Sequence, residues 1–368
     1  MRFVGGCVRD GLMQRPLGDL DAATTALPDK IIAILEKDHI RAVPTGFEHG
    51  TVTAIFQNRS IEITTLRKDA ACDGRHASVE YTNNWQEDAA RRDFTINALY
   101  LDSNGTIYDY FEGQKDLAKK SVRFIGNADE RITEDYLRIL RFFRFLATHG
   151  SPPADAEALE ACRKAKDQLL KLSGERLQTE MVKLLTAKNP AYALQCMEAT
   201  GVLALLLGSS VNLDLLQKLL GLEQLSAERP HPLLRLSFLL TEENLPAIAD
   251  RWRMSRKDSD LLKQLVTYPP IADEKNLKRA TLKLGKNIAC LLTLRDGVRL
   301  RYSADQVIQL LEHCKSWEIP VFPVSGDDLI KNGMQPGKQL GDTIKILEKK
   351  WEDSNYMLDK ITLLDSLK

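Results

Sequence analysis

Residues 1–21, MRFVGGCVRDGLMQRPLGDLD, point most directly to the fold and chemistry of this chain. A short apolar strand is predicted to run into Gly5 and Gly6, and a helix-forming segment that carries Arg9 follows. Glycines between a strand and a helix let backbone N–H groups close on a phosphate, and an arginine adds a fork of donors. We therefore expect Gly5, Gly6 and Arg9 to form a phosphate-binding loop.

Two carboxylates follow that loop. Asp19 and Asp21 are one residue apart on a predicted strand, so their side chains point the same way. Such a pair suits a hard divalent cation. Glu62, in the alternating segment 59–66, is the best candidate for a third acidic group, although the same pattern also suits a glutamate on an exposed strand face. A phosphate loop beside metal-binding carboxylates predicts phosphoryl or nucleotidyl transfer.

Composition indicates an ordinary globular protein of two or three domains. The chain has 368 residues, 43% of them hydrophobic, and no apolar run approaches the roughly 18 residues of a membrane span. We expect no signal peptide. The six cysteines form no CxxC pair, which favours reduced thiols and a cytoplasmic location and argues against zinc. Basic and acidic residues balance at 51 each, so only local basic ridges (163–188 and 275–301) favour nucleic acid, and solvated helix faces are the alternative.

The strand-like segments lie in the first 120 residues. Residues 50–56 and 59–66 alternate around a turn, and residues 98–101 and 106–110 predict a second hairpin. From about Asp129 onward only helical periodicity is present. The fold class predicted is therefore α+β, a sheet-containing head followed by a long helical part. Capping patterns at 324–328 and 335–338 predict two late helices.

Residues 88–99, DAARRDFTINAL, form a second constellation. Arg92 offers several donors to a triphosphate. Asp93 and Asn97 are four residues apart, so they share one face if the segment is helical, where they can bind ribose hydroxyls. The alternative for an RRD tripeptide is an ordinary charged surface.

Residues 133–146, TEDYLRILRFFRFL, predict one helix with Thr133 as its N-cap. In that helix Glu134 and Asp135 occupy the first turn, where acids also complement the helix dipole without any further function. The basic residues on the same ridge are Arg138, Arg141 and Arg144.

An aspartate acceptor beside an arginine donor fork resembles one half of a base pair. Asp135 can accept from the exocyclic amine of cytosine or adenine while Arg138 donates to the adjacent ring acceptors. Uracil and guanine present the opposite polarity at that edge. This pair predicts selection of C and A together.

With these motifs the chain resembles the class II tRNA nucleotidyltransferases, the CCA-adding enzymes, whose superfamily also includes bacterial poly(A) polymerases. The resemblance is strongest over the first half of the chain. The matching strings are GGCVRD (5–10), GDLD (18–21), FEHGTVT (47–53), IEITTLRKD (61–69), DGRHASVEYTNNWQEDAARRDFTINAL (73–99), DYFEGQKDL (109–117), RITEDYLRILRFFRF (131–145), SGER (173–176) and PGKQLG (336–341).

The resemblance implies a polymerase-β-like nucleotidyltransferase head with a mixed or antiparallel sheet, followed by a helical neck, body and tail. We place these at residues 1–120, 121–190, 191–270 and 271–368. It implies that Asp19, Asp21 and Glu62 are catalytic and that Asp19 and Asp21 hold two Mg²⁺ ions. The nucleotide-binding residues that it implies are Gly5, Gly6, Arg9, Arg92, Asp93, Asn97, Glu134, Asp135, Arg138, Arg141 and Arg144.

The implied activity is addition of C, C and A to the tRNA 3′ end from CTP and ATP, with no nucleic-acid template and with release of pyrophosphate. The implied partner is tRNA, held through phosphates and shape, and no stable protein partner or membrane is expected.

Two alternatives to full CCA addition stay open. One is a CC-adding, A-adding or poly(A) polymerase relative. Residues 67–85 match the flexible loop that the family needs for the final A, which counts against a CC-only enzyme. Another is a catalytically inactive tRNA-binding protein, which would have lost Asp19, Asp21 or Arg92. Finally, only four residues precede Gly5, fewer than family members usually have, so the start of the chain is a candidate truncation.

Overall fold

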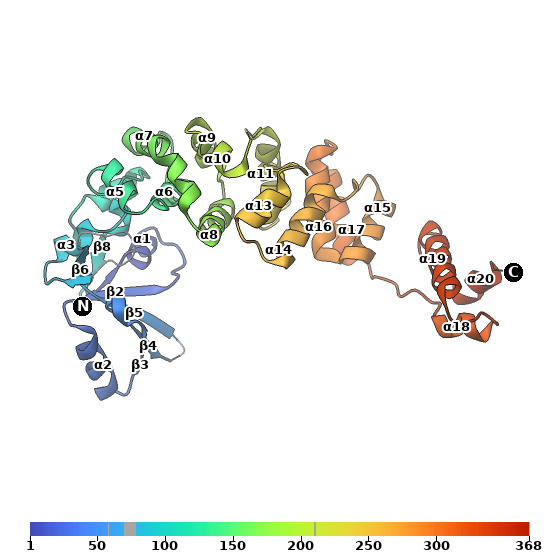
Figure 1. Cartoon of the computed structure of the whole chain (residues 1–368), viewed down its shortest axis with the longest axis horizontal. Coiled ribbons are helices and arrows are strands. Elements are labelled where there is room, and N and C mark those ends of the chain that lie inside the picture. The colour runs from blue at the N-terminus through green and yellow to red at the C-terminus, as the bar shows by residue number, and fades with distance from the viewer. Residues whose placement is uncertain (58, 70–78, 210, 368) are drawn as a thin grey trace. The chain divides into compact units, whose positions relative to one another are not determined.

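The computed structural model describes residues 1–57, 59–69, 79–209 and 211–367. They divide into two compact units: unit 1 comprises Met1–Leu213, Pro230–Pro232 and Glu243–Ser255, and unit 2 comprises Asp214–Arg229, Leu233–Glu242 and Arg256–Lys368. Figure 1 follows the chain from strands near the N-terminus into helices. Among the described residues, no helix is both long and apolar enough to cross a membrane. The two units do not test the predicted four-part division into head, neck, body and tail.

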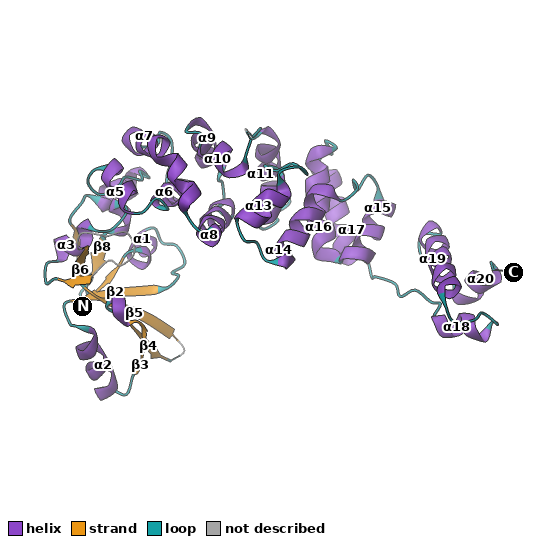
Figure 2. Ribbon diagram, viewed as in Figure 1, coloured by secondary structure: helices purple, strands orange, loops and turns teal. Residues whose placement is uncertain are grey.

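Unit 1 begins with a seven-stranded mixed sheet in the order β3-β4-β5-β2-β1-β8-β9 (Figure 2). The β2 and β5 strands are parallel, and the other neighbours are antiparallel. The strands are β1 (Arg2–Val4), β2 (Leu20–Thr24), β3 (Arg41–Gly46), β4 (Thr51–Phe56), β5 (Arg59–Thr65), β8 (Leu99–Leu101) and β9 (Ile107–Asp109).

Both predicted hairpins are confirmed, as β4–β5 and β8–β9. Strand β3 was not predicted from the sequence, nor was the separate two-stranded sheet of β6 (Arg67–Asp69) and β7 (Val79–Tyr81). No strand among the described residues follows β9, in agreement with the predicted helical remainder. The α+β fold class is confirmed.

Alternation along β2 places its side chains on two apolar layers. Ala22 belongs to a cluster with Ile31 and Leu35 of α2 (Pro28–Lys37). Ala23 faces the other way, into a cluster that includes Leu66 and Tyr100. Since a strand has a side-chain period of two, Asp21 lies on the face of Ala23.

Unit 1 also contains helices, which pack on the sheet and on one another. Two of them, α8 and α9, pack on α6, whose phenylalanines are buried; the ring of Phe142 contacts those of Phe94 and Phe124. The helices are α1 (Gly6–Leu12), η1 (Phe47–His49), α3 (Trp85–Ala90), η2 (Thr95–Asn97), α4 (Gly113–Lys119), α5 (Ala128–Glu134), α6 (Arg138–His149), α7 (Ala156–Ala165), η3 (Lys166–Lys171), α8 (Gly174–Leu185), α9 (Ala191–Ala199), α10 (Val202–Leu207) and α13 (Leu245–Arg251).

The single helix predicted over residues 133–146 is wrong, because the chain forms two helices there. Helix α5 ends at Glu134, Asp135 has an extended backbone, and α6 begins at Arg138. Thr133 is not a cap: it lies inside α5, and its hydroxyl donates to a backbone carbonyl one turn earlier at 2.8 Å.

Helices are the only regular secondary structure among the described residues of unit 2. The predicted late helices are confirmed as α18, which begins with a capping box at Ser325, and α19, which follows Gly337. The helices are α11 (Asp214–Leu225), α12 (Pro232–Ser237), α14 (Arg256–Thr267), α15 (Glu274–Leu284), α16 (Lys286–Arg299), α17 (Ala304–Ser316), α18 (Gly326–Lys331), α19 (Lys338–Asp353) and α20 (Lys360–Asp365).

The basic ridge at 275–301 is partly used inside unit 2. Lys275 pairs with Asp353 at 3.1 Å and Arg279 pairs with Glu352 at 2.9 Å, joining α15 to α19. Arg295 is almost fully buried. These basic side chains therefore have structural partners, which lowers the charge that this ridge offers to nucleic acid.

Candidate active site in unit 1

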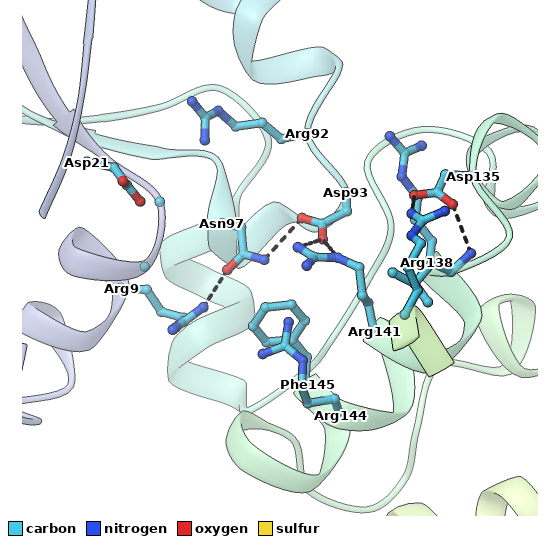
Figure 3. A pocket seen from close by; sticks show the side chains of 14 residues that line it. Arg9, Asp21, Arg92, Asp93, Asn97, Asp135, Arg138, Arg141, Arg144 and Phe145 are labelled. Carbon is cyan, nitrogen blue, oxygen red and sulfur yellow. Dashed lines mark hydrogen bonds and ion pairs between the residues drawn. The ribbon is translucent and has the colours of Figure 1, made fainter. Parts of the chain in front are cut away.

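A cavity of about 530 Å³ in unit 1 gathers most of the predicted site residues (Figure 3). Six arginine and three aspartate side chains line it, so the lining has a surplus of three positive charges, which suits an anionic ligand. The lining residues are Gly5, Gly6, Arg9, Asp21, Arg92, Asp93, Asn97, Asp135, Leu137, Arg138, Arg141, Arg144, Phe145 and Arg176.

Eleven of the fourteen predicted site residues line this cavity; Asp19, Glu62 and Glu134 do not. Conversely, sequence reasoning did not select the cavity residues Leu137, Phe145 and Arg176. Leu137 and Phe145 belong to an apolar pattern that also describes any buried helix face. Of the three, only Arg176 could have been found from the sequence, because it is the last residue of the SGER string that resembles the family.

The glycine loop joins β1 to α1. Gly5 has a positive φ of 75°, a conformation that favours glycine, and its N–H donates to the carbonyl of Leu99 at 3.1 Å. A Cβ added at Gly5 would lie 3.6 Å from Nη1 of Arg92. Backbone and guanidinium therefore border the same space, as expected for a phosphate-binding loop.

Arg9 is fixed by a buried network. Its Nε and Nη2 donate to the two carboxylate oxygens of Asp10, each at 2.9 Å, and its Nη1 donates to Asn97 Oδ1 at 2.6 Å. Burial on its own raises the pKa of Asp10, but the hydrogen bonds and charge of Arg9 lower it below its usual value. Arg9 is thus held rigidly at the cavity by ionised and polar partners.

Asp93 is the hub of the cavity wall. One carboxylate oxygen accepts from the N–H of Phe94 at 2.9 Å and from Asn97 Nδ2 at 3.1 Å. The other accepts from Arg141, whose Nε is 2.8 Å away. Although burial raises the pKa of Asp93, the Arg141 charge and these hydrogen bonds lower it overall.

Asp93 and Asn97 therefore lie together, but not through the α-helix that would have put them on one face. The segment is a 3₁₀ turn, η2 (Thr95–Asn97), and not an α-helix. In this structure the acceptor sites of Asp93 are used by protein donors, so its direct effect is to hold Asn97 and Arg141 in place.

Asp88, which was not selected from the sequence, holds Arg92 in place. Asp88 is 1% exposed and accepts from Arg92 Nη2 at 3.2 Å, from Arg91 Nη2 at 2.7 Å and from the hydroxyl of Tyr100 at 2.8 Å. From α5, Arg131 donates to the backbone carbonyl of Arg92 at 2.8 Å. The loop that carries Arg91 and Arg92 is thereby joined to strand β8 through Tyr100 and to helix α5 through Arg131.

The acidic residues meet at the edge of the cavity. The parallel register pairs Asp21 directly with Glu62. Burial, followed by the charge of Glu62, raises the pKa of Asp21; Arg92 opposes this shift, and Asp19 adds to it. This repulsion among carboxylates is what a bound cation would relieve.

These residues fit a divalent cation. In the described ranges no three His, Cys, Asp or Glu side chains are arranged as a complete protein metal site. Mg²⁺, however, usually takes only one or two carboxylates and completes its shell with water and substrate phosphates. A hard-oxygen donor set with excess negative charge beside an arginine-lined cavity matches that requirement.

Asp135 and Arg138 both line the cavity, but they do not bond to each other. The carboxylate of Asp135 accepts from the N–H of Leu137 at 3.1 Å and from Arg176 Nη2 at 2.7 Å. The first bond gives the backbone an alternative to helix, which explains the break between α5 and α6. Arg138 instead pairs with Glu134.

Three arginines converge on the buried ring of Phe145. The guanidinium carbons of Arg144, Arg9 and Arg141 lie 4.1, 5.2 and 5.6 Å from the ring centroid. The negative face of an aromatic ring reduces the cost of gathering cations. Arg144 is also held by Glu180 on α8, at 2.6 Å. Phe145 therefore helps to keep these three guanidinium groups close together without a bound anion.

Comparison with known proteins agrees with this geometry. Residues 1–123 match the family described as "Poly A polymerase head domain", and residues 155–209 match "Probable RNA and SrmB- binding site of polymerase A". The mitochondrial CCA tRNA nucleotidyltransferase 1 of Danio rerio is 36% identical, over all of this chain and 86% of the relative. The CCA-adding enzyme of Streptococcus sanguinis is 34% identical, over 94% of this chain and 87% of the relative.

A solved structure agrees as well. The Bacillus stearothermophilus CCA-adding enzyme, crystallised in complex with CTP, superposes with a TM-score of 0.77 at 27% identity, covering 96% of this chain and 89% of that one. With full-length relatives above 30% identity, this chain belongs to the CCA-adding tRNA nucleotidyltransferases of the poly(A) polymerase superfamily.

Proposed function

We propose that this chain adds C, C and A to the 3′ end of tRNA, taking CTP and ATP and releasing pyrophosphate without a nucleic-acid template. One observation carries the proposal: a single cavity has Asp21 and the arginine donors suited to phosphate at one side, and the acceptor Asp135 with the donor Arg138 at the other (Figure 3). A nucleoside triphosphate presents its phosphates and its base in the same way. The relatives named above carry the same activity in their names.

The triphosphate is assigned to the glycine loop and its arginines. Gly5 and Gly6 bring backbone close to the ligand, while Arg9 and Arg92 supply charge-assisted hydrogen bonds. Both arginines are already held by Asp10 and Asp88, so little conformational freedom is lost on binding. Asn97, held by Arg9 and Asp93, lies next to them and is assigned to the ribose.

The base is assigned to the turn between α5 and α6. Asp135 accepts from the exocyclic amine of C or A and Arg138 donates to the ring acceptors. Glu134 holds Arg138, and Arg141 and Arg144 form the adjoining wall. Selection by protein side chains explains why no nucleic-acid template is needed.

We assign two Mg²⁺ ions to Asp19 and Asp21, with Glu62 as the third acidic group. Bound Mg²⁺ lowers the pKa of an attacking hydroxyl and stabilises charge on the triphosphate. The chain's own contribution is positioning: the β2–β5 register fixes two carboxylates beside the arginines that hold the phosphates.

We assign the tRNA to the helices that follow the cavity residues in the sequence. We place the head at residues 1–120, the neck at 121–190, the body at 191–270 and the tail at 271–368. Contacts are expected with phosphates and helix shape. We also propose a cytoplasmic location, although the Danio rerio relative carries a mitochondrial name. Partial addition (CC only or A only) and poly(A) synthesis are the closest alternatives.

One experiment separates these readings. A tRNA transcript that ends at the discriminator base is incubated with Mg²⁺ and with CTP, ATP or both. Full CCA addition gives two added nucleotides with CTP alone and three with both. A product that stops at two with both nucleotides indicates CC addition, and a long ladder with ATP indicates poly(A) synthesis. No extension under any condition contradicts the proposal.

A further inference from the structure

Arg176 has no role in the function proposed above, yet it lines the cavity. It lies in the first turn of α8 and reaches the turn between α5 and α6, where its Nη2 donates to Asp135 Oδ2 at 2.7 Å. The two side chains are 47% and 35% exposed, so this ion pair faces the open space of the cavity. Arg176 is thus in direct contact with the carboxylate assigned to reading the base.

The side chain of Asp135 depends on that contact for its direction. Asp135 is the extended residue between two helices, so no helical neighbours restrict its rotamer. Its other bond is local, from the N–H of Leu137 at 3.1 Å. Arg138 does not hold it, because the Nη1 of Arg138 donates to Glu134 and to the carbonyl of Arg131, 2.8 Å away.

Arg176 itself stands on a rigid support. The neighbouring Gly174 packs so tightly that an added Cβ would lie 2.1 Å from the carbonyl oxygen of Arg251. Glu175 pairs with Arg253 at 2.9 Å. The start of α8 is therefore anchored to α13 and the residues after it, and groups on anchored elements position a site more precisely than groups on loops.

We propose that Arg176 is a positioning residue for nucleotide selection, which holds the Asp135 carboxylate in the orientation that accepts the exocyclic amine of C or A. This inference rests on the proposed function. A carboxylate has about four acceptor positions, so bonds from Leu137 and Arg176 leave room for the amine of a base. Without Arg176 the carboxylate turns more freely, and bases that lack the amine are rejected less strongly.

The test compares kcat/KM for CTP with kcat/KM for UTP on one tRNA transcript lacking CCA. In Arg176→Ala the CTP-to-UTP ratio is expected to fall about fivefold, the size of effect that a partly exposed ion pair supplies. Arg176→Lys, which keeps a donor and the charge, is expected to recover part of the ratio. Lys115→Ala is the control, because it removes an exposed ion pair of unit 1, with Glu112, that neither lines the cavity nor supports α8.

A double variant distinguishes positioning from general damage. If Arg176 acts through Asp135, the ratio for Asp135→Ala/Arg176→Ala equals that for Asp135→Ala alone, because the two residues act as one unit. Equal losses for CTP and UTP in Arg176→Ala, an unchanged ratio, or additive effects in the double variant each overturn the inference. Failure of the unmodified chain to extend tRNA would instead overturn the proposed function.

Discussion

Asp21 on β2 and Glu62 on β5 are direct partners in the parallel register of two adjacent strands. Burial, followed by repulsion from the charge of Glu62, raises the pKa of Asp21 above its usual value. Two carboxylates held side by side at such a cost, next to Arg92, are best explained by a cation that is bound during function.

Replacing Asp21 by Asn is therefore expected to stop nucleotide incorporation while tRNA binding continues. The change keeps the volume and removes the charge, so loss of at least about a hundredfold in rate is expected, as for other charge-stabilising groups in active sites. Primer extension on a tRNA transcript measures the first quantity and filter binding the second. Asp29→Asn, on the exposed side of α2, is the control and should leave both unchanged. Normal extension by the Asp21 variant would rule out the metal assignment.

Replacing Asp135 by Ala is expected to relax nucleotide choice while leaving the chemistry in place. In the proposed function Asp135 supplies the acceptor for the exocyclic amine, and it lies across the cavity from Asp21 (Figure 3). UTP and GTP should then be incorporated at rates within about tenfold of CTP and ATP, the loss expected when one hydrogen bond to a charged group disappears. Single-nucleotide extension assays with each of the four triphosphates measure this. A variant that stayed strictly selective for C and A would show that the base is read elsewhere.

The sheet and its carboxylates could be predicted because their signals are local. Alternation and turn residues mark β4 and β5, and the same pattern puts Asp21 on a strand. The prediction that Asp19 shares that strand is wrong, because β2 begins at Leu20 and Asp19 lies just before it. Even the late helices could be found from their caps, since capping depends on residues three apart, as at Ser325.

The turn at Asp135 could not be predicted, because residues 133–146 keep an uninterrupted helical period. What breaks the helix is a side-chain bond to the backbone of Leu137 together with Arg176, which is 41 residues away in the sequence. Asp88 could not be predicted either, because its burial beside Arg91 and Arg92 depends on Tyr100 and on the sheet. Contacts of this kind appear only once the fold has brought distant segments together.

Shortening the segment 69–79 is expected to stop the product at CC. Strands β6 and β7 pair Asp69 with Val79, and the residues between them, 70–78, which form the core of the predicted flexible loop, lie outside the described residues. The expectation therefore rests on the match of residues 67–85 to the family's loop. Gel analysis of the product with CTP and ATP together gives its length, and CTP incorporation in the same variant serves as the control. A complete CCA end would contradict the assignment of this loop.

His149 is expected to make the stability of unit 1 depend on pH. Burial, followed by the charge of Arg9, lowers the pKa of His149 from 6.5 to about 4, although its Nε2 lies 3.2 Å from Asp10 Oδ1. The unfolded chain takes up this proton near pH 6.5 and the folded chain only near pH 4. The free energy of unfolding therefore falls as the pH drops from 6.5 to 4, by up to about 3 kcal/mol, and the full contribution is present above pH 6.5.

The variant His149→Gln removes the titrating group but keeps an amide that can donate to Asp10. Thermal or urea unfolding between pH 7 and 4.5 should show a steep loss of stability for the unmodified chain and a shallower one for the variant. The slopes are compared rather than the absolute values, because the substitution also changes packing against Phe145, whose ring centroid is 5.7 Å from that of His149. Asp10 does not interfere, since its pKa is lowered from 3.8 and its own contribution is lost only below this range. Equal slopes would show that His149 is not held neutral by the fold.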